Sequence, residues 1–283
     1  MCSGTGRRDR VAVGQPGGLH ARVRAGLPRD DLPRTHGHAG RGTRPVHGVG
    51  TRDPARHRGR SRSPRGASVR GHAGRDGTVR SIIAERRAEP KDDIISKALT
   101  FEIDGEPVKD EDLLSFCLLM FMAGLDTVAA TLGWAFYHLA SHPEDRARIV
   151  EDPSIIPSAV EEFLRAYAIV VPARKVMHDT ELQGVQLKAG DMVNFPLSGA
   201  TRDEEAFDGA AEVDIERSPN NHIAFGAGPH RCLGSHLARR ELRIALEEWH
   251  KRIPEYRLVP GVELTETGGQ LGLTSLPIEW DRA

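Results

Sequence analysis

Apolar residues recur with helical spacing over most of the second part of the chain. The stretch from Val79 to Ala88 has a helical pattern, and an acidic start at Asp110–Asp112 introduces a longer helix that runs to about Ser141. The centre of this longer helix, LLSFCLLMFMAGLDT, is apolar nearly all round. A helix without a polar face is typical of a protein interior, so we expect a buried central helix.

The segments that follow predict more helices and a small strand-rich part. Pro143 and Pro157 lie where two helices begin, since proline is favoured in a first turn. Residues 170–195 have a strand-like pattern interrupted by turns, and a last helix runs from about Leu233 to Lys251, before Pro254. The predicted fold class is therefore mainly α with a minor β portion.

The first 77 residues show neither the apolar spacing of a helix nor the alternation of a strand. They contain no Phe, Tyr, Trp, Ile, Glu, Lys or Asn, and residues 1–80 carry 18 arginines against five acids, a net charge of +13. The remaining residues carry −14. A segment so poor in large apolar side chains is expected to be disordered. We therefore divide the chain into a basic segment, residues 1–78, and a folded domain, residues 79–283.

Three interpretations of the basic segment compete. A nucleic-acid-binding arm would use Arg against phosphate, but aromatic residues that stack on bases are missing. An organellar transit peptide would be Arg-rich, but this segment is long and lacks an amphipathic pattern. Translation of a GC-rich gene in the wrong frame explains the composition best, with a functional tail as the weaker alternative. A nucleic-acid partner is not expected.

Cysteine usage and hydropathy predict a cytoplasmic protein without a membrane anchor. The three cysteines, Cys2, Cys117 and Cys232, are too few for a disulfide scaffold and fit a reducing compartment. The longest apolar run, Leu113–Leu125, has about 13 residues, fewer than the roughly 18 that span a bilayer. The N-terminus has no apolar core of a secretory signal.

The most specific stretch for chemistry is FGAGPHRCLG, residues 225–234. It is not a phosphate loop, because no Lys-Ser/Thr follows and Arg231 takes the place of the last glycine. His230, Cys232 and His236 are three possible zinc ligands, but a structural zinc site takes four, mostly Cys. A lone cysteine is usually an inert small apolar residue. In a glycine-rich loop, beside His230 and Arg231 and just before a helix start, however, Cys232 is favoured as an exposed thiolate ligand.

This stretch resembles the haem-binding loop of the cytochromes P-450. The family pattern F-x-x-G-x-x-x-C-x-G is met by Phe225, Gly228, Cys232 and Gly234. The resemblance implies haem b, held by Cys232 as the axial thiolate ligand of the iron. It also implies that Gly226, with the other two glycines, lets the backbone approach the macrocycle and aims amides at the sulfur.

Residues 123–127, AGLDT, resemble the family's oxygen-activating motif in the long central helix. A threonine hydroxyl can bond the carbonyl one turn back and distort the helix, which would open a groove at Ala123 and Gly124. By this resemblance Asp126 and Thr127 are the catalytic residues, which relay protons during oxygen activation. The alternative is that both are ordinary polar residues in mid-helix.

Residues 162–165, EFLR, match the family's E-x-x-R. Glu162 and Arg165 lie on one helix face, so a surface ion pair is the simpler interpretation of the two residues alone. In the family the pair is buried and, through another arginine, clamps the loop before the haem cysteine. Arg217 stands at that place, and the resemblance makes the three a structural triad.

The resemblance also assigns the haem propionates and the substrate pocket. Arg174 and His230 match the positions that bind the two propionates, and an arginine suits a carboxylate. Apolar residues beside the haem would line the pocket and imply a hydrophobic substrate, although each also fits a plain core position. The expected lining residues are Leu119, Met122, Ile169, Val170 and Leu273.

The local sequence of segments such as GSHLARREL is most similar to that of soluble bacterial members that hydroxylate camphor and terpenes. The resemblance implies a monooxygenase that uses O2, an apolar terpene- or steroid-like substrate, and electrons from a ferredoxin-like partner. Arg231, Arg239 and Arg240 could offer that partner a basic face, although a solvated surface explains them equally well. The first half of the family's domain is not recognisable in residues 1–78. The alternative is therefore an inactive haem-binding fragment or pseudogene product, and an RNA-binding protein is a weaker third.

Overall fold

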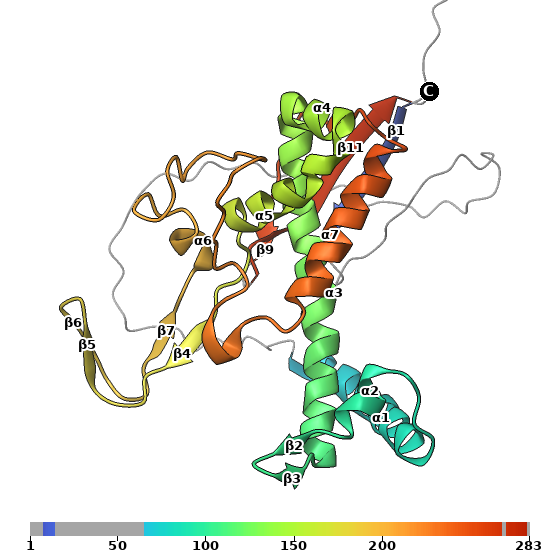
Figure 1. The fold of residues 1–283 in the computed structure, drawn as a ribbon, viewed down its shortest axis with the longest axis vertical. Coiled ribbons are helices and arrows are strands. Elements are labelled where there is room, and N and C mark those ends of the chain that lie inside the picture. The colour runs from blue at the N-terminus through green and yellow to red at the C-terminus, as the bar shows by residue number, and fades with distance from the viewer. Residues whose placement is uncertain (1–7, 15–64, 268–269, 282–283) are drawn as a thin grey trace, which may run out of the picture. The chain divides into compact units, whose positions relative to one another are not determined.

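The computed structural model describes residues 8–14, 65–267 and 270–281, with side chains described from residue 77 onward (Figure 1). The chain divides into two compact units. The smaller unit is residues 26–119, and the larger unit combines residues 1–25 with residues 120–283. Helix α3 (Asp110–Ser141) has residues in both units.

Helices dominate the described residues, which confirms the predicted fold class. The helices are α1 (Arg65–Ala88), α2 (Ile94–Ala98), α3 (Asp110–Ser141), α4 (Pro143–Glu151), η1 (Pro153–Ile155), α5 (Ile156–Ala166), α6 (Leu197–Ala200), η2 (Gly228–His230) and α7 (Ser235–His250). The strands are β1 (Arg8–Gly14), β2 (Glu102–Ile103), β3 (Glu106–Pro107), β4 (Ala173–Lys175), β5 (Thr180–Leu182), β6 (Val185–Leu187), β7 (Met192–Asn194), β8 (Arg257–Leu258), β9 (Glu266–Thr267), β10 (Gly272–Leu273) and β11 (Ser275–Asp281).

The smaller unit packs α1, α2 and the first turns of α3 around one apolar cluster. Ile83, Ala98, Leu113 and Leu114 are buried together. Asp93 begins α2, because its carboxylate accepts the backbone N–H of Ser96 at 2.8 Å. The β2–β3 hairpin connects α2 to α3.

The basic segment contains two elements that the sequence did not predict. Helix α1 begins at Arg65 and not at Val79, because the residues before Val79 lack the apolar period on which the prediction rested. Strand β1 lies near the N-terminus. Residues 1–7 and 15–64 of the segment predicted to be disordered lie outside the described residues, and the boundary at residues 78 and 79 stays a prediction.

The larger unit is built on the second half of α3, with α5, α7 and β11 packed around it (Figure 1). Each of these four elements contributes a buried side chain to one continuous core: Leu139, Phe163, Leu246 and Ile278. Trp134 adds a fixed link, since its indole N–H donates to the carbonyl of Leu271 at 2.7 Å. The proline-initiated helices are observed as α4 and α5.

Short antiparallel pairs make up the β portion of the larger unit. Strand β11 pairs with β8 on one side and with β1 on the other. The strand-like stretch of residues 170–195 forms two pairs, β4 with β7 and β5 with β6. The first pair places Arg174 opposite Val193 and so positions one of the expected cofactor-binding residues.

The centre of helix α3 is not buried as the sequence analysis expected, because its apolar residues 121–125 are exposed. The helix has 32 residues, and its most apolar window has a mean hydropathy of 2.0 and is 17% buried, so by length and composition it could cross a membrane. The run of 13 residues was too strict a measure, because Ser, Thr and Gly do not interrupt such a helix. Asp126, however, lies in its middle, and a carboxylate at a bilayer centre costs about 2.5–3.5 kcal/mol.

His250, buried near the end of α7, makes the stability of the protein depend on pH. Its Nδ1 donates to the carbonyl of Leu246 at 2.7 Å, and its Nε2 then accepts the hydroxyl of Tyr256 at 3.1 Å. Burial lowers the pKa of His250 below the usual 6.5. The unfolded chain therefore binds more protons below pH 6.5, and the stabilisation, complete above that pH, is lost as pH falls toward the folded pKa.

We expect the free energy of unfolding, measured with urea, to fall between about pH 7.5 and about pH 5.5. His250→Gln should make this dependence less steep, because it removes one of two buried histidines whose pKa is lowered by burial, the other being His138. His236→Gln, which changes an exposed histidine of the same helix, should leave the dependence intact. An equal pH slope in all three proteins would contradict the assignment.

Candidate functional site

The loop before α7 presents the thiol of Cys232 to solvent. Two backbone bonds shape it: the Cys232 N–H donates to the carbonyl of Phe225 at 2.8 Å, and the Gly226 N–H donates to that of Ile223 at 2.7 Å. Gly226 and Gly228 have φ of +70° and +66°, where a side chain would strain the backbone. The glycines thus allow a tight loop that ends at an exposed sulfur.

Apolar side chains are exposed on both sides of this loop. Leu233 and Leu237 are 69% and 60% exposed, and Met122 and Leu125 on α3 are 54% and 48% exposed. The loop and α3 meet in the core, where Phe225 packs against the same cluster as α3. These exposed apolar side chains are candidates for contact with an apolar ligand.

The oxygen-activating motif lies on α3 in the larger unit. The Thr127 hydroxyl donates to the carbonyl of Ala123 at 2.7 Å, so the expected bond one turn back is present. A Cβ added at Gly124 would meet no atom within 4 Å. The expected distortion is absent, because α3 is a continuous α-helix over 110–141 and a threonine bond of this kind can coexist with the helical ladder. Asp126 is half-buried beside Thr127.

The E-x-x-R pair is fully buried, with 0% exposure of both side chains, so it is not a surface ion pair. Glu162 accepts Nε and Nη2 of Arg165 at 2.8 and 2.7 Å, and Arg217 Nε lies 3.2 Å from both of its oxygens. The Asn220 amide and the Asp214 N–H complete the set at 2.9 and 2.8 Å. Burial opposes ionisation, but these donors outweigh it and lower the pKa of Glu162.

The two arginines also fix the chain that leads to the cysteine loop. Arg165 donates to three backbone carbonyls at 2.7–2.9 Å, and Arg217 donates to two more at 2.7 and 3.2 Å. The acceptors are Thr201, Ala210 and Glu212 for Arg165, and Asp208 and Gly209 for Arg217. The structure therefore brings Glu162, Arg165 and Arg217 together, as the triad requires.

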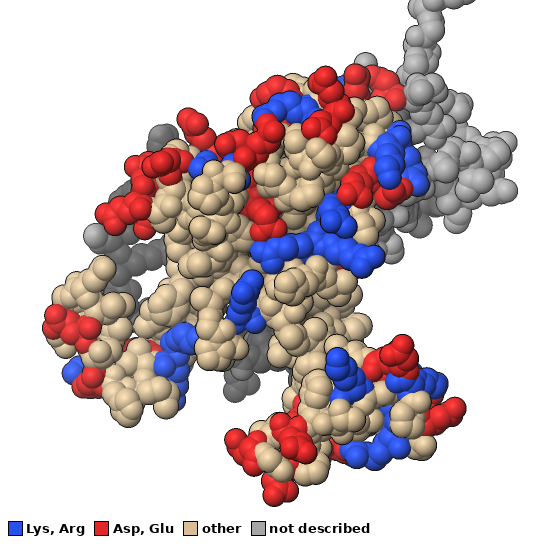
Figure 2. Space-filling model, in the orientation of Figure 1, with Lys and Arg blue, Asp and Glu red and all other residues tan. Residues whose placement is uncertain are grey.

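Arg239 differs from the prediction that it offers a free basic surface. Its Nε and Nη2 lie 2.6 and 2.8 Å from the two oxygens of Glu161, and its guanidinium lies 4.6 Å from the ring centre of Phe225. Glu161 also bonds Nε2 of His222 at 3.1 Å. Spacing along the sequence could not reveal this cluster, because it joins residues from three separate segments. Arg231 and Arg240 are exposed, and Figure 2 shows a band of Lys and Arg atoms over α7 and the loop before it.

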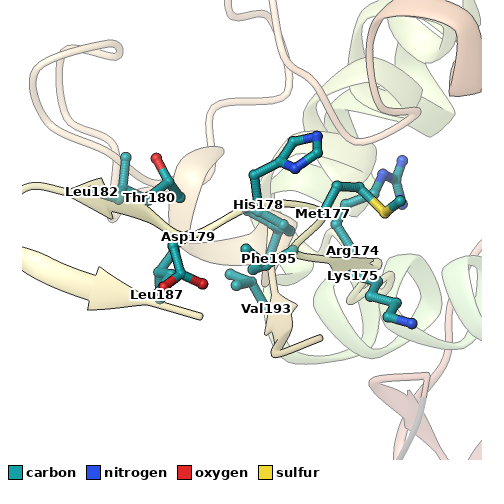
Figure 3. Close-up of a pocket in the computed structure, with 11 residues that line it drawn as sticks. Arg174, Lys175, Met177, His178, Asp179, Thr180, Leu182, Leu187, Val193 and Phe195 are labelled. Carbon is teal, nitrogen blue, oxygen red and sulfur yellow. The ribbon is translucent and has the colours of Figure 1, made fainter. Parts of the chain in front are cut away.

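The two expected propionate ligands are exposed bases. Arg174 donates to the carbonyl of its neighbour Ala173 at 2.8 Å, and His230 lies on η2. Among the described residues neither has a carboxylate partner. Arg174 lines an open cavity of about 440 Å³ with Met177, His178 and Phe195, and Figure 3 shows Arg174 and Lys175 leaving β4 on opposite sides.

The expected substrate-lining residues divide into two groups. Met122 is exposed and Val170 half-buried, whereas Ile169 and Leu273 are each 5% exposed and lie in the interior. That Ile169 and Leu273 line a pocket stays a prediction; periodicity did not reveal how deeply these two residues are buried. Leu119 is exposed in the smaller unit.

The described residues contain no group of three His, Cys, Asp or Glu side chains that could hold a metal ion. This disfavours the zinc interpretation of His230, Cys232 and His236. What remains is an exposed thiol, two unpaired bases and exposed apolar side chains. These groups fit a flat apolar cofactor that carries anionic side groups and a metal ion able to bind a thiolate.

Comparisons with known proteins identify the class. Residues 68–249 match the family described as Cytochrome P450, and the match begins inside the predicted basic segment. The chain is 36% identical over 203 residues to the probable cytochrome P450 127A1 of Sinorhizobium fredii, covering 71% of this chain and 49% of that protein. It is 37% identical over 204 residues to a steroid C26-monooxygenase of Mycobacterium tuberculosis, covering 71% and 55%.

Solved structures agree. The crystal structure of CYP109E1 from Bacillus megaterium in complex with testosterone has a TM-score of 0.70 and 34% identity, covering 75% of this chain and 59% of that one. The likeness in sequence and in fold thus defines the class as the cytochromes P450. The chain belongs to the cytochrome P450 family. It spans about half the length of the curated relatives it matches.

The buried triad predicts a large stability effect for one substitution. Arg165→Met removes the main partner of Glu162 and leaves a buried carboxylate, which costs about 3–5 kcal/mol. Urea unfolding of the variant should show a loss of that size. Arg148→Ala breaks an exposed ion pair with Glu216 and should cost about 0–1 kcal/mol. Equal losses in the two variants would contradict the role given to burial.

Proposed function

We propose that this chain binds haem b through the Cys232 thiolate and belongs to a monooxygenase that oxidises an apolar small molecule. The observation that carries the proposal is the exposed sulfur of Cys232 at the end of a tight glycine loop, in a chain of this family. Cys117, the other cysteine with a described position, is half-buried on α3, away from any such loop.

The residues around Cys232 fit the rest of the cofactor. Leu233 and Leu237 beside the loop and Met122 on α3 offer apolar contact to a macrocycle, and burying them would remove exposed apolar surface from water. Arg174 and His230 would bind the two propionates, since each is an exposed base without a carboxylate partner among the described residues. Gly226, Gly228 and Gly234 leave room for close backbone approach.

Bound haem would supply the activation of O2 and the insertion of one oxygen atom into the substrate, with two electrons and two protons consumed. The chain would supply the protons and the shape of the site. The Thr127 hydroxyl donates a hydrogen bond to the carbonyl of Ala123, which leaves its oxygen lone pairs to accept a hydrogen bond from within the site. Asp126, half-buried beside it, would pass protons from solvent.

Substrate, partner and location follow from the same proposal. The exposed apolar side chains of Met122 and Leu125 and the half-buried Val170 favour a terpene- or steroid-like molecule. A ferredoxin-like donor is acidic, so the exposed Arg231 and Arg240 would attract it to the face that carries the cysteine loop. The bacterial relatives support a cytoplasmic location.

The ligand assignment is tested by spectroscopy of the haem-loaded, reduced protein with carbon monoxide. We expect the Soret band of a thiolate-ligated haem, and its complete loss in Cys232→Ser, because a hydroxyl does not replace a thiolate as the fifth ligand. Cys117→Ser is the matched control and should retain the band. A band that survives in Cys232→Ser would refute the assignment.

A second candidate function is haem binding without coupled oxidation. It is favoured by the exposure of Met122 and Leu125, since a monooxygenase must exclude bulk water from the reacting centre and hold its substrate in place. Under this alternative the haem binds at the same loop, but the apolar wall on α3 stays open to water.

We expect this chain to turn reducing equivalents mainly into peroxide and not into hydroxylated product. The test supplies electrons from a surrogate ferredoxin system and compares peroxide with product over a panel of terpenes and steroids. A haem-loaded Cys232→Ser sample measures the background from unspecific haem. Recovery of nearly every reducing equivalent as product would exclude the alternative and support the monooxygenase.

A further inference from the structure

Two adjacent carboxylates of α5 contact different parts of the chain that leads to Cys232. Glu162, with Arg165 and Arg217, fixes residues 201–220 through hydrogen bonds. Glu161, which is next to it, bonds His222 and Arg239, the first just before the cysteine loop and the second on α7 just after it. The loop is therefore attached to α5 on both sides, and the second attachment is not part of the E-x-x-R triad.

The orientation of Arg239 is determined from two directions. Its two hydrogen bonds to Glu161 form a bidentate pair, which fixes the plane of the guanidinium. Its guanidinium carbon lies 4.6 Å from the centre of the Phe225 ring, within the range of a cation–π contact. Arg239 therefore connects α5 to the ring at the start of the cysteine loop.

Phe225 then transmits this constraint to the cysteine. Its carbonyl accepts the Cys232 N–H at 2.8 Å, the bond that brings the two ends of the loop together. The ring also packs against the core cluster, so contacts on the side chain and a hydrogen bond on the backbone hold the same residue. A short path thus leads from Glu161 through Arg239 and Phe225 to the backbone of Cys232.

His222 strengthens the same attachment. Its Nδ1 accepts the backbone N–H of Ala224 at 3.2 Å, so its Nε2 carries the proton and donates to Glu161 at 3.1 Å. The imidazole is itself nearly inaccessible to solvent. Burial opposes the charge of Glu161, but the donors His222 and Arg239 lower the pKa of Glu161 to about 2, so it is ionised at neutral pH.

Arg239 also interacts electrostatically with the cysteine. The pKa of Arg239 is raised, first by its hydrogen bonds to Glu161 and, with a smaller effect, by the charge of Cys232. The bidentate pair with Glu161 holds the guanidinium in place beside the loop.

We propose that Arg239, held by Glu161 and stacked on Phe225, is a positioning residue that fixes the loop so that Cys232 presents its thiolate to the iron. This inference rests on the proposed haem function but concerns residues outside the triad and the cofactor contacts. Because the clamp is made by protein groups alone, it exists in the haem-free chain and can be measured there.

The first test measures hydrogen exchange of the Cys232 amide in the haem-free full chain. Arg239→Ala should raise its exchange rate roughly tenfold, which corresponds to about 1.4 kcal/mol. Arg239→Lys should keep part of this increase, because an ammonium neither forms the bidentate pair nor stacks in the same way. Arg243→Ala is the matched control: it breaks an exposed Arg–Glu pair one turn further along α7 and should leave the rate unchanged.

Glu161→Gln should act in the same direction, and the double variant with Arg239→Ala should add little, because the two residues belong to one path. In the haem-loaded proteins, Arg239→Ala should lower the fraction of the reduced carbon monoxide complex with the thiolate-type Soret band, while Arg243→Ala keeps it. Far-ultraviolet circular dichroism checks that each variant is folded.

The outcomes separate this inference from the proposed function. An unchanged Cys232 exchange rate and an unchanged band fraction in folded Arg239→Ala would overturn the positioning role, even if Cys232→Ser loses the band as expected. If the native chain shows no thiolate-type band, the haem proposal fails, and with it the haem-directed part of this role. Increased exchange in Arg239→Ala would still support the clamp itself.

Discussion

The buried charge of Glu162 is the constraint on which the larger unit depends. A carboxylate removed from water must be paired and hydrogen-bonded, and Arg165 and Arg217 meet that requirement from two different segments. The same arginines then donate to five backbone carbonyls between residues 201 and 212, where helix and sheet bonds are largely missing. Charge neutralisation thus orders an irregular segment that no apolar period could order.

The consecutive positions of Glu161 and Glu162 extend this logic to the cysteine loop. Adjacent helical residues point in different directions, so the two carboxylates on one turn of α5 can bind two separate segments of the chain. Glu162 faces the segment before the loop, and Glu161 faces α7 after it. The exposed sulfur of Cys232 is held by interactions that are themselves buried or half-buried, so the reactive group does not depend on its own contacts for its position.

The sequence predicted the helices and the site motifs better than the partners of single side chains. The bounds of α4, α5 and α7 follow from prolines and an apolar stripe, and the cysteine loop follows from its glycines. Arg239 looked like a surface base, because its carboxylate partner lies 78 residues away along the chain. Apolar character alone also did not reveal that Ile169 and Leu273 are almost fully buried whereas Met122 is exposed.

Helix α3 illustrates how composition and position give different answers. Its length and hydropathy suit a membrane, and its exposed apolar residues suit either lipid or a bound apolar group. Asp126 and Thr127 argue against a lipid environment for this helix. In lipid the mid-helix carboxylate of Asp126 would have no polar partner, whereas a site that moves protons would use it. The hydrogen bond from Thr127 to Ala123 supports the same conclusion, since it lies on the stretch where Ala123, Gly124 and Leu125 are exposed. The polar interruption of the helix therefore coincides with its open face, which is where a haem site would need both properties together.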